Sequence, residues 1–277
     1  MVSEDFGDHS FYITEAPLHA VEIAKDISQE TDHLIIAGGD GLINEVVNGL
    51  EHMPKIMILP IGSGNDLSRS LGLQKHSLKE IFSINRNNSK YKSIDVGVAD
   101  IRKSNNELIR RKFISSSGLG LDAMIASLSN RKSVLRGLPL YLSSTFLALY
   151  RFNPGYAEVL LDGVLHSSEI KHLISIGNTK SSGGGFHLTP KAEIDDGLLD
   201  ITMAQKFRKL KLLSILPKAI SGKHILENGV TNTQFKNCQI KLANPTFMHT
   251  DGEIIGGDIV EVNYSIQKMK LDFLIKS

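Results

Sequence analysis

A short apolar run, a glycine-rich turn and a helical pattern follow one another at residues 33–50, and this arrangement constrains the fold of the 277-residue chain most strongly. The run Leu34–Ile36 predicts a buried strand, and Asp40 lies among the glycines of the turn. The helix that follows places its apolar residues on one face: Ile43, Val46, Val47 and Leu50. Glycines let a backbone approach a phosphate closely, and the free N–H groups of a first helical turn point towards it, so this stretch predicts an anion site.

Three common phosphate-binding fingerprints do not fit this turn. The dinucleotide pattern and the kinase glycine loop need a small residue or a glycine where Asn44 stands. The P-loop needs Lys and then Ser or Thr after its last glycine, where this chain has Leu42 and Ile43. An acid inside the turn would repel a triphosphate unless a cation lay between them, so Asp40 predicts a bridging Mg²⁺. A plain strand–helix turn with Asp40 near the N-cap explains this stretch equally well.

A second unit of the same kind follows the first. Lys55–Pro60 predicts another short strand, and Gly62, Ser63, Gly64 and Asn65 form the turn before a helix that begins near Asp66. Two consecutive units place both turns at the carboxyl edge of a parallel sheet, where α/β sheets bind ligands. Ser63 and Asn65 have side chains that hydrogen-bond nucleotides, and Asp66 adds a second acid.

These two loops, GGDGLINEVVNGL and LPIGSGNDLSRSLGL, resemble the diacylglycerol kinase catalytic family, which includes bacterial lipid kinases and sphingosine and ceramide kinases. The resemblance covers nearly the whole chain, because four later segments stand in the family's order: IDVG at 94–97, FISSSGLG at 113–120, IDDGLLD at 194–200 and DGE at 251–253. It implies a Rossmann-like α/β nucleotide domain at residues 1–91, a mainly antiparallel β-sandwich domain at 92–277 and an active site in the cleft between them.

The residues of the second half support the same architecture. Strand patterns predominate from Tyr91 onward, including one run at 91–99 and another at 259–275, and Asp162-Gly163 is a strong hairpin signal. Helical patterns interrupt them near 121–131, 138–150 and 209–220. An α/β nucleotide domain joined to a β-rich domain is therefore expected.

The resemblance also implies the site residues. The Glu of the DGE segment is the family's proton acceptor, which makes Glu253 the general base beside Asp251, with Asp40 and Asp66 supporting metal and nucleotide. By spacing alone, DGE is an ordinary hairpin turn. A positioned carboxylate suits the chemistry, because a lipid hydroxyl is a poor nucleophile until its proton is taken. The nucleotide contacts implied are Thr14, Gly38, Gly39, Asp40, Gly41, Leu42, Ile43, Asn44, Glu45, Gly62, Ser63, Gly64 and Asn65.

A second metal site is implied in the acidic segment at 193–200. Carboxylates and carbonyl oxygens at this spacing suit a hard cation, although a solvated acidic turn is the plainer interpretation. In the family this loop carries a structural Mg²⁺, and its ligands map to Asp196 and to the backbone oxygens of Glu193 and Leu198.

The chain departs from the family pattern in two places. Leu42 replaces the usual Thr after the Gly-Gly-Asp-Gly turn, which removes one hydroxyl ligand to the nucleotide. The family usually begins with a strand and an Asn-Pro-x-Ser/Gly loop, and nothing similar precedes Ser10, so the sequence either begins after that loop or lacks it.

Composition limits the partners. A net charge of +1 and the absence of Trp argue against nucleic acid. The single Cys238 excludes an internal disulfide and suits a cytoplasmic protein, and no apolar run reaches the roughly 18–20 residues of a membrane span. Residues 138–150 and the basic amphipathic segment 206–223 are candidates for transient contact with the inner face of a membrane, although packing on a sheet is the commoner use of such helices. A homodimer is also expected.

The main hypothesis is therefore an ATP- and Mg²⁺-dependent kinase that phosphorylates a primary hydroxyl of a membrane lipid, with diacylglycerol as the first candidate. Phosphatidylglycerol and a sphingoid lipid remain candidates. One alternative is an NAD kinase, whose family shares the Gly-Gly-Asp-Gly turn. The other is a regulator that binds nucleotide or lipid without turnover.

Overall fold

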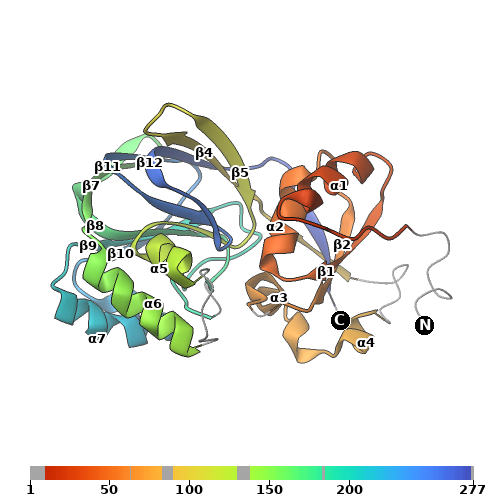
Figure 1. Cartoon of the computed structure of the whole chain (residues 1–277), viewed down its shortest axis with the longest axis horizontal. Helices are drawn as coiled ribbons and strands as arrows, with labels where there is room; N and C mark the ends of the chain where they lie inside the picture. Colours follow the sequence, from red (N-terminus) through yellow and green to blue (C-terminus); the bar gives the residue numbers. More distant parts are fainter. Residues whose placement is uncertain (1–9, 63, 83–89, 130–137, 183–184, 276–277) are drawn as a thin grey trace.

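The computed structural model describes residues 10–62, 64–82, 90–129, 138–182 and 185–275, and it contains two β-sheets, each with its own core (Figure 1). The smaller sheet has four strands in the order β1-β2-β13-β3. The larger sheet has nine strands, of which eight follow the order β10-β9-β8-β6-β11-β12-β4-β5, while β7 pairs with β8 and β11. The predicted α/β domain joined to a β-rich domain is confirmed.

The smaller sheet contains the two strand–turn–helix units. Strands β1 and β2 are parallel, with His33 opposite Lys55 and Gly38 opposite Pro60, so both glycine turns leave the sheet at one edge. The elements of this part are α1 (His19–Ile27), β1 (His33–Gly38), α2 (Asp40–Gly49), β2 (Lys55–Pro60), α3 (Asp66–Ser70), the 3₁₀ turn η1 (Leu73–Lys75), α4 (Leu78–Phe82), β3 (Lys90–Ile94) and β13 (Leu271–Ile275).

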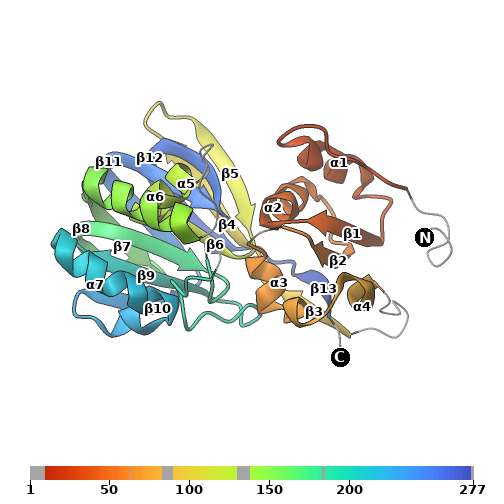
Figure 2. The same cartoon turned by 60° about the horizontal axis from the view of Figure 1, so that its bottom comes forward.

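The larger sheet is antiparallel in every strand pair of the described residues. Its strands are β4 (Gly97–Lys103), β5 (Leu108–Phe113), β6 (Ser116–Gly120), β7 (Gly155–Leu161), β8 (Val164–Gly177), β9 (Leu199–Gln205), β10 (Val230–Phe235), β11 (Cys238–Thr250) and β12 (Glu253–Ile266). Its helices are α5 (Leu121–Ser129), α6 (Leu138–Arg151), α7 (Lys209–Ile220) and the 3₁₀ turn η3 (Lys223–Leu226). Figure 2 shows α5, α6 and α7 together on one face of this sheet, where they share a small apolar core.

In the large sheet, β6 and β7 each pair with β8 on one side and with β11 on the other. Along the chain, α5 and α6 lie between β6 and β7. The predicted Asp162-Gly163 hairpin is present, because Leu161 pairs with Val164 across a turn in which both central residues have positive φ. No helix among the described residues is both long and apolar enough to cross a bilayer.

The junction of the two sheets differs from the sequence prediction. The run at 91–99 was expected as one strand, but it forms the end of β3 in the small sheet and the start of β4 in the large one. Asp95 lies at the break, where its buried carboxylate is 2.9 Å from Lys270 Nζ and accepts a 2.8 Å hydrogen bond from Gly197 N. These polar contacts hold the chain out of a continuous strand.

The run at 259–275 divides in the same way. Strand β12 ends at Ile266 in the large sheet, whereas β13 pairs with β2 and β3 in the small one. Lys270 immediately precedes β13, so its ion pair with Asp95 joins the two crossings between the sheets. A single division of the chain at residue 91 therefore does not describe the small sheet, which contains a strand from the far end of the sequence.

Candidate active site

The two glycine turns are in direct contact. A Cβ atom built on Gly62 would lie 2.4 Å from Gly39 Cα, and Ile61 N donates a 3.2 Å hydrogen bond to Gly38 O. No residue larger than glycine fits at that approach. Gly39 is also the N-cap of α2, so the first N–H groups of this helix open at the place where the turns meet.

Asp40 links the two turns electrostatically. Its carboxylate accepts hydrogen bonds from Asp66 N at 3.1 Å and from Leu67 N at 3.5 Å, which are the first two amides of α3. Burial raises the pKa of Asp40, the carboxylates of Asp66 and Asp251 add to this rise, and the two amides oppose it. A divalent cation at Asp40 would favour the ionised form.

The side chains around Asp40 fit a metal ion that is shared with a bound phosphate better than a metal ion that is held by protein ligands alone. No group of three or more His, Cys, Asp and Glu side chains in the described ranges could hold a metal ion. Mg²⁺ is commonly held by one or two carboxylates together with phosphate oxygens and water, which is what Asp40 would offer beside the predicted phosphate-binding turn.

Asp66 and Asn65 mainly shape the second turn. Arg69 Nη1 lies 2.5 Å from Asp66 Oδ1, and Arg69 Nη2 donates to Gly64 O at 3.1 Å. Asn65 has φ of 52° and donates from its amide to Gly62 O at 2.6 Å. Its Oδ1 is buried and accepts no hydrogen bond within the described part of the chain, so one polar atom of the predicted nucleotide loop is left for a ligand. Ser63 lies outside the described residues.

Glu253 reaches the same place from the other sheet. It is the exposed first residue of β12, and its Oε1 lies 2.8 Å from the position that a Cβ atom on Gly41 would occupy. The carboxylate therefore lies over the first turn of α2, beside Gly41. The structure thus places the predicted base at the first turn of α2, which begins where the two predicted nucleotide turns are in contact.

Asp251 has a different position from Glu253. Its Oδ1 accepts hydrogen bonds from Ser115 N at 2.8 Å and Ser116 N at 2.9 Å, and its Oδ2 accepts from Ile114 N at 2.9 Å and Asn44 Nδ2 at 2.8 Å. Burial raises the pKa of this carboxyl, and the four donors act against the rise. Asp251 thus ties the start of β6 and helix α2 to the turn that carries Glu253.

The other predicted contact residues differ in their surroundings. The Ile43 side chain is fully buried in the core of the small sheet. Glu45 accepts a 3.3 Å hydrogen bond from Ala20 N at the start of α1. Thr14 is exposed, and Leu42 packs against Gly38, where a Cβ atom would lie 2.4 Å from Leu42 Cδ2. Of these residues, Leu42 comes closest to the turn, and it presents methyl groups rather than a hydroxyl.

In the predicted second metal loop, both carboxylate oxygens of Asp196 already accept hydrogen bonds from protein groups. Asp196 accepts from Leu198 N at 3.0 Å through Oδ1 and from Gln234 Nε2 at 3.1 Å through Oδ2. The predicted ligand set of Glu193, Asp196 and Leu198 relies on two backbone oxygens, and its occupancy by a metal stays a prediction.

The contacts that join α2 to β5 were not predicted from the sequence. Lys112 donates from Nζ to Val47 O at 3.2 Å and to Leu50 O at 2.7 Å, at the C-terminal end of α2. Asn48 accepts from Lys112 N at 2.8 Å and donates to Lys112 O at 3.0 Å. Asn44 and Asn48 are four residues apart and so share a helix face, which is the one signal in the sequence for this contact.

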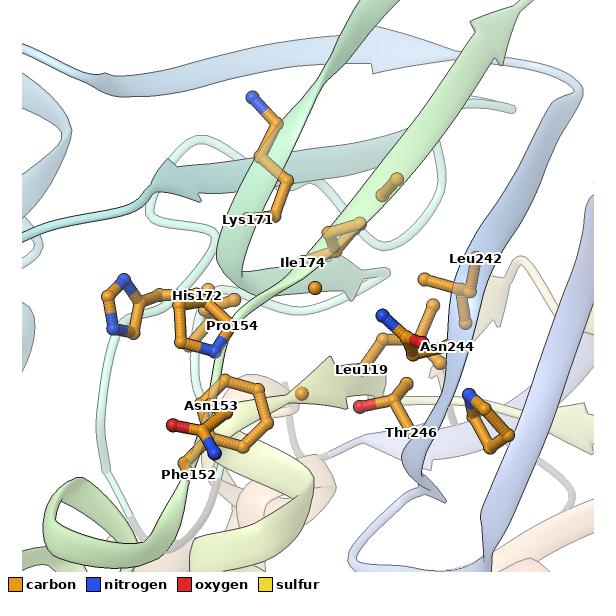
Figure 3. A pocket seen from close by; sticks show the side chains of 15 residues that line it. Leu119, Phe152, Asn153, Pro154, Lys171, His172, Ile174, Leu242, Asn244 and Thr246 are labelled. Atoms are coloured by element: carbon orange, nitrogen blue, oxygen red, sulfur yellow. The ribbon is translucent and has the colours of Figure 1, made fainter.

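A cavity of about 270 Å³ lies in the large sheet, at the far end of β6 from Asp251 (Figure 3). Leu119, Phe152, Ile174 and Leu242 give it apolar walls, and His172 and Asn244 are among its polar residues. The sequence did not predict it, because its walls come from β6, β7, β8, β11 and the segment 152–154.

Comparisons with known proteins agree with this geometry. Residues 2–99 match the diacylglycerol kinase catalytic domain, and residues 115–271 match the YegS C-terminal NAD kinase beta sandwich-like domain. A diacylglycerol kinase of Mycobacterium tuberculosis (strain ATCC 25618 / H37Rv) is 30% identical over 220 residues, which are 79% of this chain and 70% of that protein. A diacylglycerol kinase of Bacillus subtilis (strain 168) is 28% identical over 253 residues, which are 89% of this chain and 80% of that protein.

Solved structures show the same fold. A putative diacylglycerol kinase from Bacillus anthracis str. Sterne superposes with a TM-score of 0.72 at 23% identity, covering 95% of this chain and 84% of that one. Yeast NADH kinase superposes with a TM-score of 0.56 at 13% identity, covering 92% of this chain and 65% of that one. This chain therefore belongs to the diacylglycerol kinase family of lipid kinases, which use a nucleotide and a divalent metal to phosphorylate a hydroxyl group.

Proposed function

We propose that this lipid kinase phosphorylates the primary hydroxyl of diacylglycerol, using ATP and Mg²⁺, and releases phosphatidic acid and ADP. The position of Glu253 over the first turn of α2 carries the proposal. It puts a carboxylate beside the place where the N-terminus of α2 would hold the terminal phosphates. The names of the diacylglycerol kinases of M. tuberculosis and B. subtilis support this acceptor.

Each group has a separate task in the transfer. The amides of the two turns and the N-terminus of α2 would bind phosphate oxygens. Asp40 would hold the Mg²⁺, and the ion would supply charge neutralisation for the transferring phosphoryl group. Glu253 takes the proton of the lipid hydroxyl as its oxygen bonds to the γ-phosphorus and the bond to the β-phosphate oxygen breaks. Asp251, Asp66 and Asn65 position the backbone around these groups.

An NAD kinase is the second candidate, because yeast NADH kinase shares the fold. Fold alone assigns no acceptor. A panel of diacylglycerol, phosphatidylglycerol, sphingosine and NAD, assayed with labelled ATP, separates the candidates. Transfer to NAD in preference to every lipid would overturn the proposal, and nucleotide binding without transfer to any acceptor would favour a regulator.

The decisive variant is Glu253→Gln, which keeps the shape of the side chain and removes the base. We expect a fall in turnover of about 10²–10⁴-fold, with the affinity for ATP nearly unchanged. Asp40→Ala is expected to weaken Mg²⁺–ATP binding instead. If Glu253→Gln turned over diacylglycerol at the wild-type rate, Glu253 would have no part in the transfer.

We further infer that the face formed by α6 and α7 meets the membrane that contains the acceptor. Phe146, Tyr150 and Leu210 are 58%, 77% and 82% exposed there. Neither helix contains an acidic residue, and Lys209 Nζ lies 5.1 Å from the centre of the Tyr150 ring. Exposed aromatic and aliphatic side chains beside cations suit an anionic bilayer surface.

This inference is tested by replacing Phe146, Tyr150 and Leu210 together with Ser. Sedimentation with vesicles of phosphatidylglycerol and phosphatidylcholine is expected to show weaker binding, while activity on a short-chain, water-soluble diacylglycerol persists. Unchanged vesicle binding would remove this face from the membrane contact.

A further inference from the structure

Behind the turn that carries Glu253 lies a buried pair of ionisable side chains with no part in the mechanism above. His249, near the end of β11, is 4% exposed, and Asp122, in the first turn of α5, is 9% exposed. His249 Nε2 and Asp122 Oδ2 are 3.6 Å apart. A buried carboxylate is costly unless a partner compensates it, so the pair calls for an explanation.

The hydrogen bonds define how the imidazole is used. Gly252 N donates to His249 Nδ1 at 3.3 Å, so Nδ1 is the acceptor and the ring proton lies on Nε2, the nitrogen that faces Asp122. Asp122 Oδ1 accepts from Ala123 N at 2.8 Å. Asp122 Oδ2 has no hydrogen-bond partner among the described residues, and the 3.6 Å contact with Nε2 is electrostatic rather than a formed hydrogen bond.

Gly118 on β6 provides the space for this pair. A Cβ atom built there would lie 2.0 Å from Asp122 Oδ2 and 2.6 Å from His249 Nε2. The FISSSGLG segment therefore has a glycine at the point where both side chains cross the strand. A methyl group at this position would separate the pair without altering either member.

The main chain of His249 is held independently of its ring. Ser117 Oγ donates to His249 O at 2.8 Å and lies 2.9 Å from Tyr264 Oη. The turn that follows has two residues of positive φ, Asp251 at 48° and Gly252 at 85°, before Glu253 pairs with Thr250. The two central residues of this turn are therefore held by different groups. The Asp251 carboxylate accepts four hydrogen bonds, and the Gly252 amide donates to the His249 imidazole.

We propose that His249 and Asp122 are positioning residues that hold the Gly252 amide and so direct the Glu253 carboxylate towards the lipid hydroxyl. Asp122 keeps the imidazole in the tautomer that accepts from Gly252, in the way that a carboxylate orients a catalytic or ligating histidine elsewhere. This proposal rests on the function of Glu253 proposed above.

The test uses three variants. Two of them distinguish the hydrogen-bond acceptor of His249 from the rest of its ring, and the third disturbs the contact between His249 and Asp122. His249→Asn keeps an oxygen near the position of Nδ1, His249→Leu removes both nitrogens, and Gly118→Ala separates the pair. His166→Leu, on the exposed part of β8, is the matched control.

A displacement of about 1 Å at a catalytic group costs up to about 10²-fold in rate, so His249→Leu is expected to lower kcat at least about tenfold with KM for ATP within about twofold. Gly118→Ala is expected to have the same effect, His249→Asn to recover most of the rate, and the control to match the wild type. Equal losses in His249→Asn and His249→Leu, or no loss in kcat for His249→Leu, would overturn the proposal.

A second measurement does not depend on activity. Nitrogen-15 NMR of labelled histidine is expected to show His249 protonated on Nε2 in the wild type, and hydrogen exchange at the Gly252 amide is expected to accelerate in His249→Leu. A ring protonated on Nδ1 would contradict the geometry. An inactive Glu253→Gln together with a fully active His249→Leu would refute this proposal alone, whereas an active Glu253→Gln would refute the proposed function.

Discussion

Replacing Asp251 by Ala tests whether this carboxylate is the main support of the turn that carries Glu253. The change removes the acceptor of four hydrogen bonds, three of them from the amides of the buried residues Ile114, Ser115 and Ser116. An unsatisfied buried donor costs about 1–3 kcal/mol. Water entering the vacated space and the relief from burying a charge offset part of this cost, so we expect a net loss of about 3–5 kcal/mol in the free energy of unfolding.

Urea denaturation measures this loss. With a slope of about 3 kcal/mol/M, the midpoint is expected to fall by more than about 1 M at an unchanged slope. Asn44→Ala, which removes one donor and leaves the three amides paired, is expected to lose about 1–2 kcal/mol. Asp26→Ala, an exposed position on α1, is expected to change stability by less than about 0.5 kcal/mol. A loss below about 1 kcal/mol for Asp251→Ala would mean that burying the charge costs as much as its hydrogen bonds give.

Three other predictions concern different parts of the structure. Lys112→Met keeps the apolar stem but removes two hydrogen bonds at the end of α2, and denaturation is expected to show a loss of about 2–3 kcal/mol. Burial lowers the pKa of Lys112, so the unfolded chain binds more protons just below the ordinary value of 10.5, and the stability difference between wild type and this variant should grow as the pH rises towards that value. Leu42→Thr is expected to improve ATP affinity or turnover, while losing about 1–2 kcal/mol of stability because the methyl contacts with Gly38 disappear; no gain in either kinetic measurement would mean that other groups replace the hydroxyl. Burial raises the pKa of the Cys238 thiol, so a thiol reagent at pH 8 is expected to modify the protein only after denaturation, and rapid modification of the folded protein would contradict the burial of Cys238.

The parts of the fold that sequence predicted correctly are those encoded by neighbouring residues. Both strand–glycine–helix units carry their strand, turn and helix signals within about twenty residues, and the parallel pairing of β1 and β2 follows from placing one unit after the other. The hairpin at Asp162-Gly163 is equally local. The antiparallel domain was recognisable because strand patterns predominate from Tyr91 onward and a strong hairpin signal stands among them.

The parts that sequence missed depend on contacts between distant residues. Asn44 and Asp251 are 207 positions apart, and Lys112 lies 62 positions from Leu50. A periodic pattern carries no information on such distances. The break at Asp95 was missed for the same reason, because its partner Lys270 belongs to the other crossing of the chain.

For the candidate site, the sequence predicted its position in the fold better than it predicted the contacts of individual residues. Glu253 lies beside Gly41, the residue that follows Asp40, although nothing between these positions in the chain indicates it. Ile43, by contrast, was assigned to the nucleotide by resemblance, whereas its own helical spacing already placed it on the apolar face, and the structure follows the spacing. Asp251 resembles a catalytic acid in sequence and is enclosed by four donors in the fold.

The position of β13 between β2 and β3 has a consequence for synthesis on the ribosome. The part of the protein that is translated first, up to the end of β3, cannot finish its sheet until residues 271–275 emerge, because β3 hydrogen-bonds to β13 and not to β2. Until then the nascent chain presents an open edge of β2, an attachment point for other unpaired strands. Translation from the N-terminus therefore makes β1, β2 and β3 of the small sheet first. The sheet is completed only when β13 follows, after all strands of the larger sheet have been made.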